Sequence, residues 1–160
     1  MVNNEKMALP DDLPEPEDHG ETDHLIDITV PSVNLVATNG ETIDLSELQN
    51  LVIVYCYPKI GRPDQDVSPP GWDDIPGARG CTPESCGFRD EYQEIMSIGV
   101  DKIFGLSLQP SDYQQESKER LNLPFELLSD VNHEFTHSLQ LPTFEVAGEI
   151  FLKRHTLVFF

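Results

Sequence analysis

Two cysteines at the start of a helical pattern are the residues of this sequence best suited to chemistry. Cys81 and Cys86 stand five positions apart. Thr82 before Pro83 predicts an N-cap and a first helical position, so Cys81 is expected at the helix N-terminus. Unpaired N–H groups and the positive end of the helix dipole stabilise an anion there. We therefore expect the pKa of Cys81 to fall below the ~8.5 of a free thiol, which would make the thiolate the nucleophile.

The spacing of the two cysteines limits how they can react with each other. In a helix, positions i and i+5 are rotated by roughly 140° and separated by ~7.5 Å of rise. That separation exceeds the reach of a disulfide. The two sulfurs can meet only if the first turns of the helix unwind.

The third cysteine has a different setting. Cys56 lies within the apolar run from Leu51 to Tyr57, which is typical of a strand buried on both faces by helices. Free cysteine is among the residue types most often buried in a core. We expect Cys56 to be a structural core residue.

The residues around the cysteines carry a resemblance to a known family. The segment G-C-T-P-E-S-C-G-F-R-D at 80–90 resembles the active-site region of the peroxiredoxins, most closely the bacterioferritin comigratory protein type with both cysteines in one helix. The likeness runs from about Val30 to the C-terminus. It includes V-I-V-Y-C-Y-P-K, F-G-L-S, L-P-F-E-L-L-S-D and K-R-H-T-L, in that order. Several independent segments in one order make it far more specific than a lone pair of cysteines.

The resemblance implies a thiol peroxidase that reduces hydrogen peroxide or organic hydroperoxides without a metal or organic cofactor. Cys81 would attack the peroxide and become a sulfenic acid. Cys86 would resolve it to a disulfide, and thioredoxin or a similar dithiol would reduce that disulfide. Arg154 would reach the peroxidatic sulfur, where its permanent charge can stabilise the thiolate and orient the peroxide. Gly80 and Thr82, which flank Cys81, are the expected substrate-binding residues.

Two alternatives to a peroxidase stay open. One is a thioredoxin-like protein disulfide reductase, although such enzymes favour C-x-x-C, in which both sulfurs meet without unwinding. The other is a non-catalytic redoxin fragment with a binding role.

A separate motif, H-E-F-T-H at 133–137, matches the zinc metallopeptidase pattern H-E-x-x-H. No obvious third ligand follows it and the expected helix is barely two turns long, so we interpret the match as chance and expect no metal.

Composition excludes several classes of partner. The 10 basic and 29 acidic residues give a net charge of −19, which argues against nucleic acid or an anionic membrane. Three cysteines are too few for a secreted disulfide scaffold, and no apolar run approaches ~18 residues. The N-terminus lacks the basic and apolar regions of a signal peptide. We expect a cytoplasmic protein that is a monomer or homodimer.

Periodicity predicts one α/β domain behind a tail. Residues 1–23 hold three prolines and many acids with few large apolar groups, so we expect a disordered acidic tail before a redoxin domain at 24–160. Strands alternating with helices, after an N-terminal hairpin, predict a three-layer domain with a central mixed sheet. The resemblance implies the thioredoxin-like fold. We expect hairpins at 32–45 and over Ala147-Gly148, and strands at 51–57, 102–108, 125–128 and 154–160. We expect helices at 81–98 and at 132–139. A further helix should begin at Ser111, which would form a capping box with Gln114.

The end of the sequence also differs from the resembling family. There, the last strand continues through a turn into an edge strand and a C-terminal helix. We expect this C-terminal strand and helix to be missing, which would leave apolar sheet surface and unpaired backbone groups beside Val158, Phe159 and Phe160. Such a chain would be marginally stable or self-associating.

One substitution near the nucleophile generates a prediction about rate. Peroxiredoxins usually carry a threonine three residues before the nucleophile, whose hydroxyl contacts the peroxide, and Ala78 stands at that position. Either Thr82 or a residue of the long loop at 58–80 supplies the hydroxyl, or backbone N–H groups and Arg154 hold the peroxide alone. We expect turnover slower than in typical relatives by about 10²-fold if one positioned donor is absent. Stopped-flow measurement of a rate constant near the diffusion limit would refute this.

Overall fold

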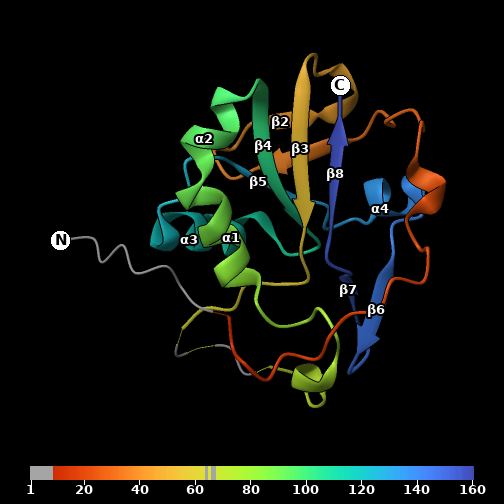
Figure 1. Ribbon diagram of the computed structural model, residues 1–160, viewed down its shortest axis with the longest axis vertical. Coiled ribbons are helices and arrows are strands. Elements are labelled where there is room, and N and C mark those ends of the chain that lie inside the picture. The colour runs from red at the N-terminus through yellow and green to blue at the C-terminus, as the bar shows by residue number, and fades with distance from the viewer. Residues whose placement is uncertain (1–8, 64, 66–67) are drawn as a thin grey trace.

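The computed structural model describes residues 9–63, 65 and 68–160, and its centre is a six-stranded sheet (Figure 1). The strand order is β2-β1-β5-β4-β3-β8. The bounds are β1 (Asn34–Ala37), β2 (Thr42–Asp44), β3 (Leu51–Cys56), β4 (Val100–Ser107), β5 (Leu127–Ser129) and β8 (His155–Phe159). Strands β3, β4 and β5 run parallel, whereas β1, β2 and β8 pair antiparallel. The sheet is therefore mixed, as predicted.

Helices cover both faces of this sheet and complete the three layers. They are α1 (Cys81–Asp90), α2 (Tyr92–Ser97), α3 (Ser111–Leu121) and α4 (Glu134–Leu139), with short 3₁₀ helices at Asp23–Leu25, Leu45–Glu47 and Trp72–Asp74. Successive strand residues point to opposite faces. One face packs against α1, α2 and α3, and the other against α4. Within the described residues, no helix has both the length and the apolar character needed to cross a membrane.

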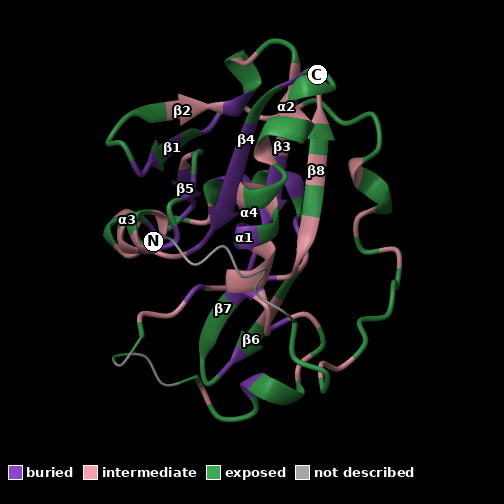
Figure 2. Cartoon of the chain, turned by 60° about the vertical axis from the view of Figure 1, so that its left-hand side comes forward, coloured by how far each residue is buried: buried purple, intermediate pink, exposed green. Residues whose placement is uncertain are grey.

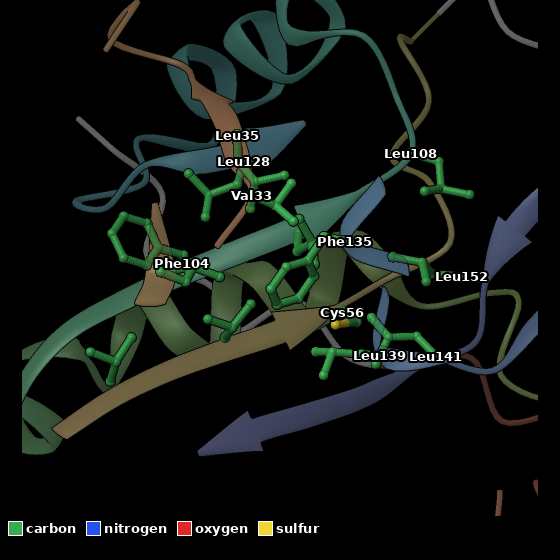
Figure 3. Close-up of a cluster of buried hydrophobic side chains, with 14 of the residues drawn as sticks. Val33, Leu35, Cys56, Phe104, Leu108, Leu128, Phe135, Leu139, Leu141 and Leu152 are labelled. Atoms are coloured by element: carbon green, nitrogen blue, oxygen red, sulfur yellow. The ribbon is translucent and has the colours of Figure 1, made fainter. Parts of the chain in front are cut away.

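The two buried cores divide the side chains of β3 between them. Tyr55 lies in the core beneath α1 and α3, together with Cys81 and Cys86. Its neighbours Val54 and Cys56 belong to the opposite core, with Phe135 of α4 (Figure 3). The α1-side core therefore holds both cysteines of the expected reactive pair, and the other core holds Cys56.

A second, two-stranded sheet stands apart from the main one. The predicted hairpin over Ala147-Gly148 is confirmed as β6 (Thr143–Val146) and β7 (Glu149–Leu152), which lie below the main sheet in Figure 1. Both turn residues have positive φ, 52° and 79°, as a tight two-residue hairpin turn requires. Phe151 of β7 packs against Trp72, with ring centroids 4.9 Å apart. The hairpin thus supports the long loop that leads into α1.

The start and length of the cysteine helix differ from the prediction. The N-cap is Gly80, in the left-handed region at φ 98°, and Thr82 lies inside the first turn instead. Pro83 is then the third helical residue, where a backbone N–H has no intrahelical acceptor and its absence costs nothing. The Glu84 N–H donates to the Gly80 carbonyl and closes the first turn. The predicted single helix at 81–98 is wrong, because it is interrupted at Glu91 and forms the two helices α1 and α2.

The predicted capping box of α3 is wrong for a tertiary reason. The N-cap is Pro110, and Ser111 is the first helical residue. The Gln114 amide turns into the protein and donates to Ser107 Oγ at 2.9 Å and to the Leu128 carbonyl at 2.7 Å. Two buried acceptors therefore compete successfully with the backbone of the helix for this side chain.

The N-terminal segment was expected to be a disordered acidic tail. Residues 1–8 of the expected tail lie outside the described residues, and disorder of residues 9–23 stays a prediction. Within that segment Asp12 pairs with Arg79 at 3.0 Å and Glu21 with Lys153 at 2.6 Å. Exposed pairs of this kind stabilise a fold little.

At the C-terminal end, β8 is the edge of the described sheet (Figure 2). Val158 is 59% exposed and Phe160 95% exposed. The expected absence of a further strand and helix stays a prediction.

The close packing of Gly105 generates a stability prediction. A Cβ added there would lie 2.6 Å from Leu127 Cδ2 and 2.8 Å from Tyr55 Cζ. Leu127 and Tyr55 are both fully buried, so neither can move away without disturbing the core. We expect Gly105→Ala to destabilise the protein by ~1–3 kcal/mol in urea unfolding. Gly87→Ala is the control: nothing lies within 4 Å and the site is helical, so it should stabilise by ~0.5–1 kcal/mol. Equal stability of the two variants would contradict this account.

Candidate active site

The Cys81 sulfur lies where α1 begins, beside the end of β3. It is 4% exposed and packs in the same core as Tyr57 and Ile60. Its Sγ accepts a hydrogen bond from Arg154 Nη2 at 3.1 Å and stands 3.7 Å from the Ala78 carbonyl oxygen. A cation and a backbone carbonyl therefore meet at one buried sulfur.

The guanidinium of Arg154 is fixed by the loop that precedes α1. Its Nε and Nη2 donate to the Gly77 carbonyl at 3.2 and 3.1 Å, and Nη2 also donates to the Arg79 carbonyl at 3.1 Å. Its Nη1 pairs with the Glu84 carboxylate in the first turn of α1. This ion pair ties the arginine to the first turn of α1. A planar donor held on several sides can present one N–H to the sulfur in a constant direction.

The expectation of a lowered pKa for Cys81 is wrong. Burial raises the pKa of this thiol above its ordinary value, and this outweighs the opposing effects of the Arg154 charge and of a hydrogen bond from the Lys59 backbone. Desolvation penalises the thiolate when the first helical residue faces the core. The reduced protein therefore keeps the sulfur protonated over a wider pH range than a free thiol.

Cys86 lies on the same helix and is also buried, with 2% of its surface exposed. Burial raises the pKa of Cys86, against a smaller lowering by Arg89. Both cysteines are free thiols. Their places at the first and sixth positions of α1 keep the predicted helical separation between the sulfurs.

A cavity of about 380 Å³ opens beside Cys81. Gly80 and Thr82 line it, as does Trp72 from the long loop. Ser68 also lines it and offers a second hydroxyl. The sequence indicated either Thr82 or an unspecified residue of the long loop as the source of the hydroxyl. Periodicity could not have identified Ser68, because the loop has none.

Arg154 faces a second, adjoining cavity of about 790 Å³. Gly80 borders both cavities, and Leu9 and Leu13 of the N-terminal segment form the far wall of the second. The structure thus gathers Cys81, Arg154, Gly80 and Thr82 at one place. It keeps Cys86 behind them in the core.

The remaining candidates lie away from this place. Cys56 is fully buried in the opposite core, as predicted, and burial raises the pKa of its thiol strongly (Figure 3). The His133 and His137 rings have centroids 5.8 Å apart at the start of α4. Across the described part of the chain, no three His, Cys, Asp or Glu side chains form a group able to hold a metal ion. The Asp130 carboxylate, which the sequence did not indicate, accepts hydrogen bonds from the backbones of Phe135 and Thr136 and so caps α4.

Known proteins with similar sequences share this region. Residues 75–159 match the AhpC/TSA family. The chain is 38% identical over 101 residues to the putative peroxiredoxin bcp of Coxiella burnetii, a match that covers 62% of this chain and 56% of that protein. It is 30% identical over 112 residues to peroxiredoxin Bcp of Bacillus subtilis, covering 69% of this chain and 60% of that protein. The chain thus spans less than two thirds of the length of these relatives.

Solved structures agree on the fold. The crystal structure of the peroxidoxin BcpB of Mycobacterium tuberculosis matches with a TM-score of 0.63 at 24% identity, over 82% of this chain and 75% of that one. The reduced Prx3 of Vibrio vulnificus in complex with H₂O₂ matches with a TM-score of 0.64 at 18% identity, over 82% and 77%. At these identities the likeness concerns the fold, which is thioredoxin-like. The family match covers more than half of the sequence and includes both cysteines of α1, and the two relatives named above are Bcp peroxiredoxins. The chain therefore belongs to the AhpC/TSA family.

Proposed function

We propose that this chain is a thiol-dependent peroxidase that reduces hydrogen peroxide or organic hydroperoxides through Cys81. The observation that carries the proposal is the contact of Arg154 Nη2 with Cys81 Sγ at 3.1 Å, beside a cavity at the start of α1. A positioned cation is what a thiol nucleophile needs both to ionise and to orient a peroxide. Membership of the AhpC/TSA family supports the same reading.

The first step oxidises Cys81. The Sγ thiolate attacks the terminal oxygen of the peroxide, the new S–O bond forms, and the O–O bond breaks. The leaving alkoxide takes a proton and departs as alcohol, or as water when the substrate is hydrogen peroxide. Arg154 faces the developing charge, and Thr82 and Ser68 are the hydroxyls at the cavity wall that can hydrogen-bond the peroxide. Gly80, which borders both cavities, leaves room for the substrate.

The second step uses Cys86. Its sulfur attacks the sulfenic sulfur of Cys81, an S–S bond forms, and the S–O bond breaks to release water with the proton of the Cys86 thiol. Because the two residues are the first and sixth of α1, this part of the helix must open first. An external dithiol such as thioredoxin then reduces the disulfide, and no metal or organic cofactor takes part. We place this chemistry in the cytoplasm, in a monomer or homodimer.

Three serine variants test the function. We expect Cys81→Ser to abolish peroxide consumption with dithiothreitol or thioredoxin as reductant. Without added reductant, Cys86→Ser should reduce one equivalent of peroxide and stop as the sulfenic acid, because only resolution is lost. Cys56→Ser is the control and should turn over like the wild type. Mass spectrometry after one equivalent of peroxide should find a Cys81–Cys86 bridge, with a loss of helix by circular dichroism. A bridge to Cys56, or activity that survives Cys81→Ser, would overturn the mechanism.

The raised pKa of Cys81 generates a prediction about pH. Burial holds the thiol protonated at neutral pH, so the rate of peroxide attack should rise with pH through and beyond the ordinary thiol range as the thiolate fraction grows. Arg154→Met removes the charge that opposes burial, so its pH profile should move to higher pH still. At fixed pH its rate should fall by about 10²–10³-fold.

Lys153→Met is the matched control for Arg154. Lys153 is the neighbouring cation and pairs with Glu21 of the N-terminal segment. Its removal should leave the pH profile in place. Equal profiles for Arg154→Met and the wild type would exclude Arg154 from the reaction.

A further inference from the structure

A buried pair of hydroxyls joins the sheet to α1 between the two cysteines. Tyr55 of β3 points its ring toward α1, and its hydroxyl oxygen lies 2.9 Å from Ser85 Oγ. Both residues are fully buried. No water can replace either partner while the helix stays in place, so each hydroxyl depends on the other.

The packing around Tyr55 fixes the sheet side of this bond. Its ring stacks on Phe88, with centroids 4.5 Å apart and planes 10° apart, and meets the edge of Phe125 at 5.8 Å. Gly105 is its registered partner on β4, and a Cβ there would lie 2.8 Å from the Tyr55 hydroxyl oxygen. The hydroxyl therefore has one available position. The hydrogen bond therefore forms only when Ser85 lies next to that position.

The position of Ser85 connects this bond to resolution. Ser85 lies in α1 directly before Cys86, on the part of the helix that must unwind for the two sulfurs to meet. Beyond it, Arg89 Nη1 donates to the Leu121 carbonyl at 2.8 Å and holds the end of α1 to α3. Tyr55 thus contacts α1 on both sides of Cys86: its ring stacks on Phe88 near the Arg89 anchor, and its hydroxyl pairs with Ser85 between the two cysteines.

We propose that Tyr55 and Ser85 form a latch that keeps α1 wound between the cysteines and sets the rate at which Cys86 reaches oxidised Cys81. The proposal rests on the proposed function, because it concerns the resolving step. Tyr55 and Ser85 are positioning residues, since neither bonds to a reacting sulfur. Each turnover breaks the latch, and each reduction of the disulfide closes it again.

The latch also determines which product Cys81 yields. While α1 stays wound, the sulfenic acid can react with a second peroxide, which transfers an oxygen to the sulfur and leaves as alcohol or water. The product is a sulfinic acid that thiols do not reduce. A stronger Tyr55–Ser85 bond slows resolution and so gives the second peroxide more time to react. A weaker bond favours the disulfide.

Single substitutions in the latch should speed resolution. We expect Tyr55→Phe and Ser85→Ala each to raise the rate of disulfide formation by about two- to tenfold, the effect of losing one hydrogen bond. Rapid quenching with a thiol reagent and mass spectrometry would measure this rate. The sulfinic fraction at excess peroxide should fall, and the rate of the first oxidation should stay unchanged. In the double variant the gain should be smaller than the product of the single effects, because no hydroxyl is left unpaired.

Ser117→Ala is the matched control. Ser117 is a buried serine of α3 whose hydroxyl donates to the Tyr113 carbonyl at 3.3 Å, in a helix that the proposed resolving step does not require to open. Its loss should alter neither the resolution rate nor the sulfinic fraction. A gain in Ser117→Ala equal to that of Ser85→Ala would overturn the proposal, since general destabilisation would then explain both.

Hydrogen exchange separates the failure of the latch from failure of the proposed function. In the reduced protein, the amides of residues 84–86 should exchange about two- to tenfold faster in Tyr55→Phe and Ser85→Ala than in the wild type or Ser117→Ala. If peroxide forms no Cys81–Cys86 bridge in the wild type or in any variant, the proposed function fails. The hydrogen-exchange rates then decide by themselves whether the two hydroxyls hold the helix. If the wild type forms the bridge and the latch variants form it no faster, the latch is wrong.

Discussion

The contact between Arg154 and the Cys81 sulfur joins residues 73 positions apart, and the rest of the structure is arranged to make it. Antiparallel pairing of β8 with β3 sets His155 opposite Cys56, so the arginine before β8 arrives where β3 ends. The loop after β3 then turns back through Gly77 and Arg79, whose carbonyls hold the guanidinium. The β6–β7 hairpin supports that loop through Trp72. Sheet register therefore determines where the charge stands.

Two opposing effects act on the same sulfur. Burial of Cys81 protects it from solvent and raises its pKa, while Arg154 favours the charged form. Because burial is the larger effect, the resting state is a protected thiol that is held beside its activating cation. Reactivity then depends on pH and on what enters the adjacent cavity, more than on a thiolate that is always present. This arrangement keeps an oxidisable group away from solvent until a molecule enters the cavity beside it.

Local sequence was sufficient to predict most of the elements and the placing of Cys81 and Cys86 on one helix, because alternation, turn residues and the G-C-T-P-E-S-C segment are short-range signals. It failed where long-range contacts decide. Gln114 leaves its expected capping box for acceptors on β4 and β5, and the sign of the Cys81 pKa shift depends on a core built from distant segments. Ser68 could not be assigned from a loop without periodicity. The pairing of Tyr55 with Ser85 requires knowledge of which face of β3 lies under α1.

The alternation of β3 has a consequence for how this protein can be studied. Tyr55 and Cys56 are adjacent, yet one faces the reactive helix and the other faces α4 across the full thickness of the sheet. In the proposed mechanism, opening of α1 exposes Cys81 and Cys86 while Cys56 stays covered by α4. A thiol reagent can therefore label Cys56 only when α4 leaves the sheet or the sheet itself comes apart. Its labelling rate reports unfolding outside α1, in the same chain whose other two thiols report on the local opening.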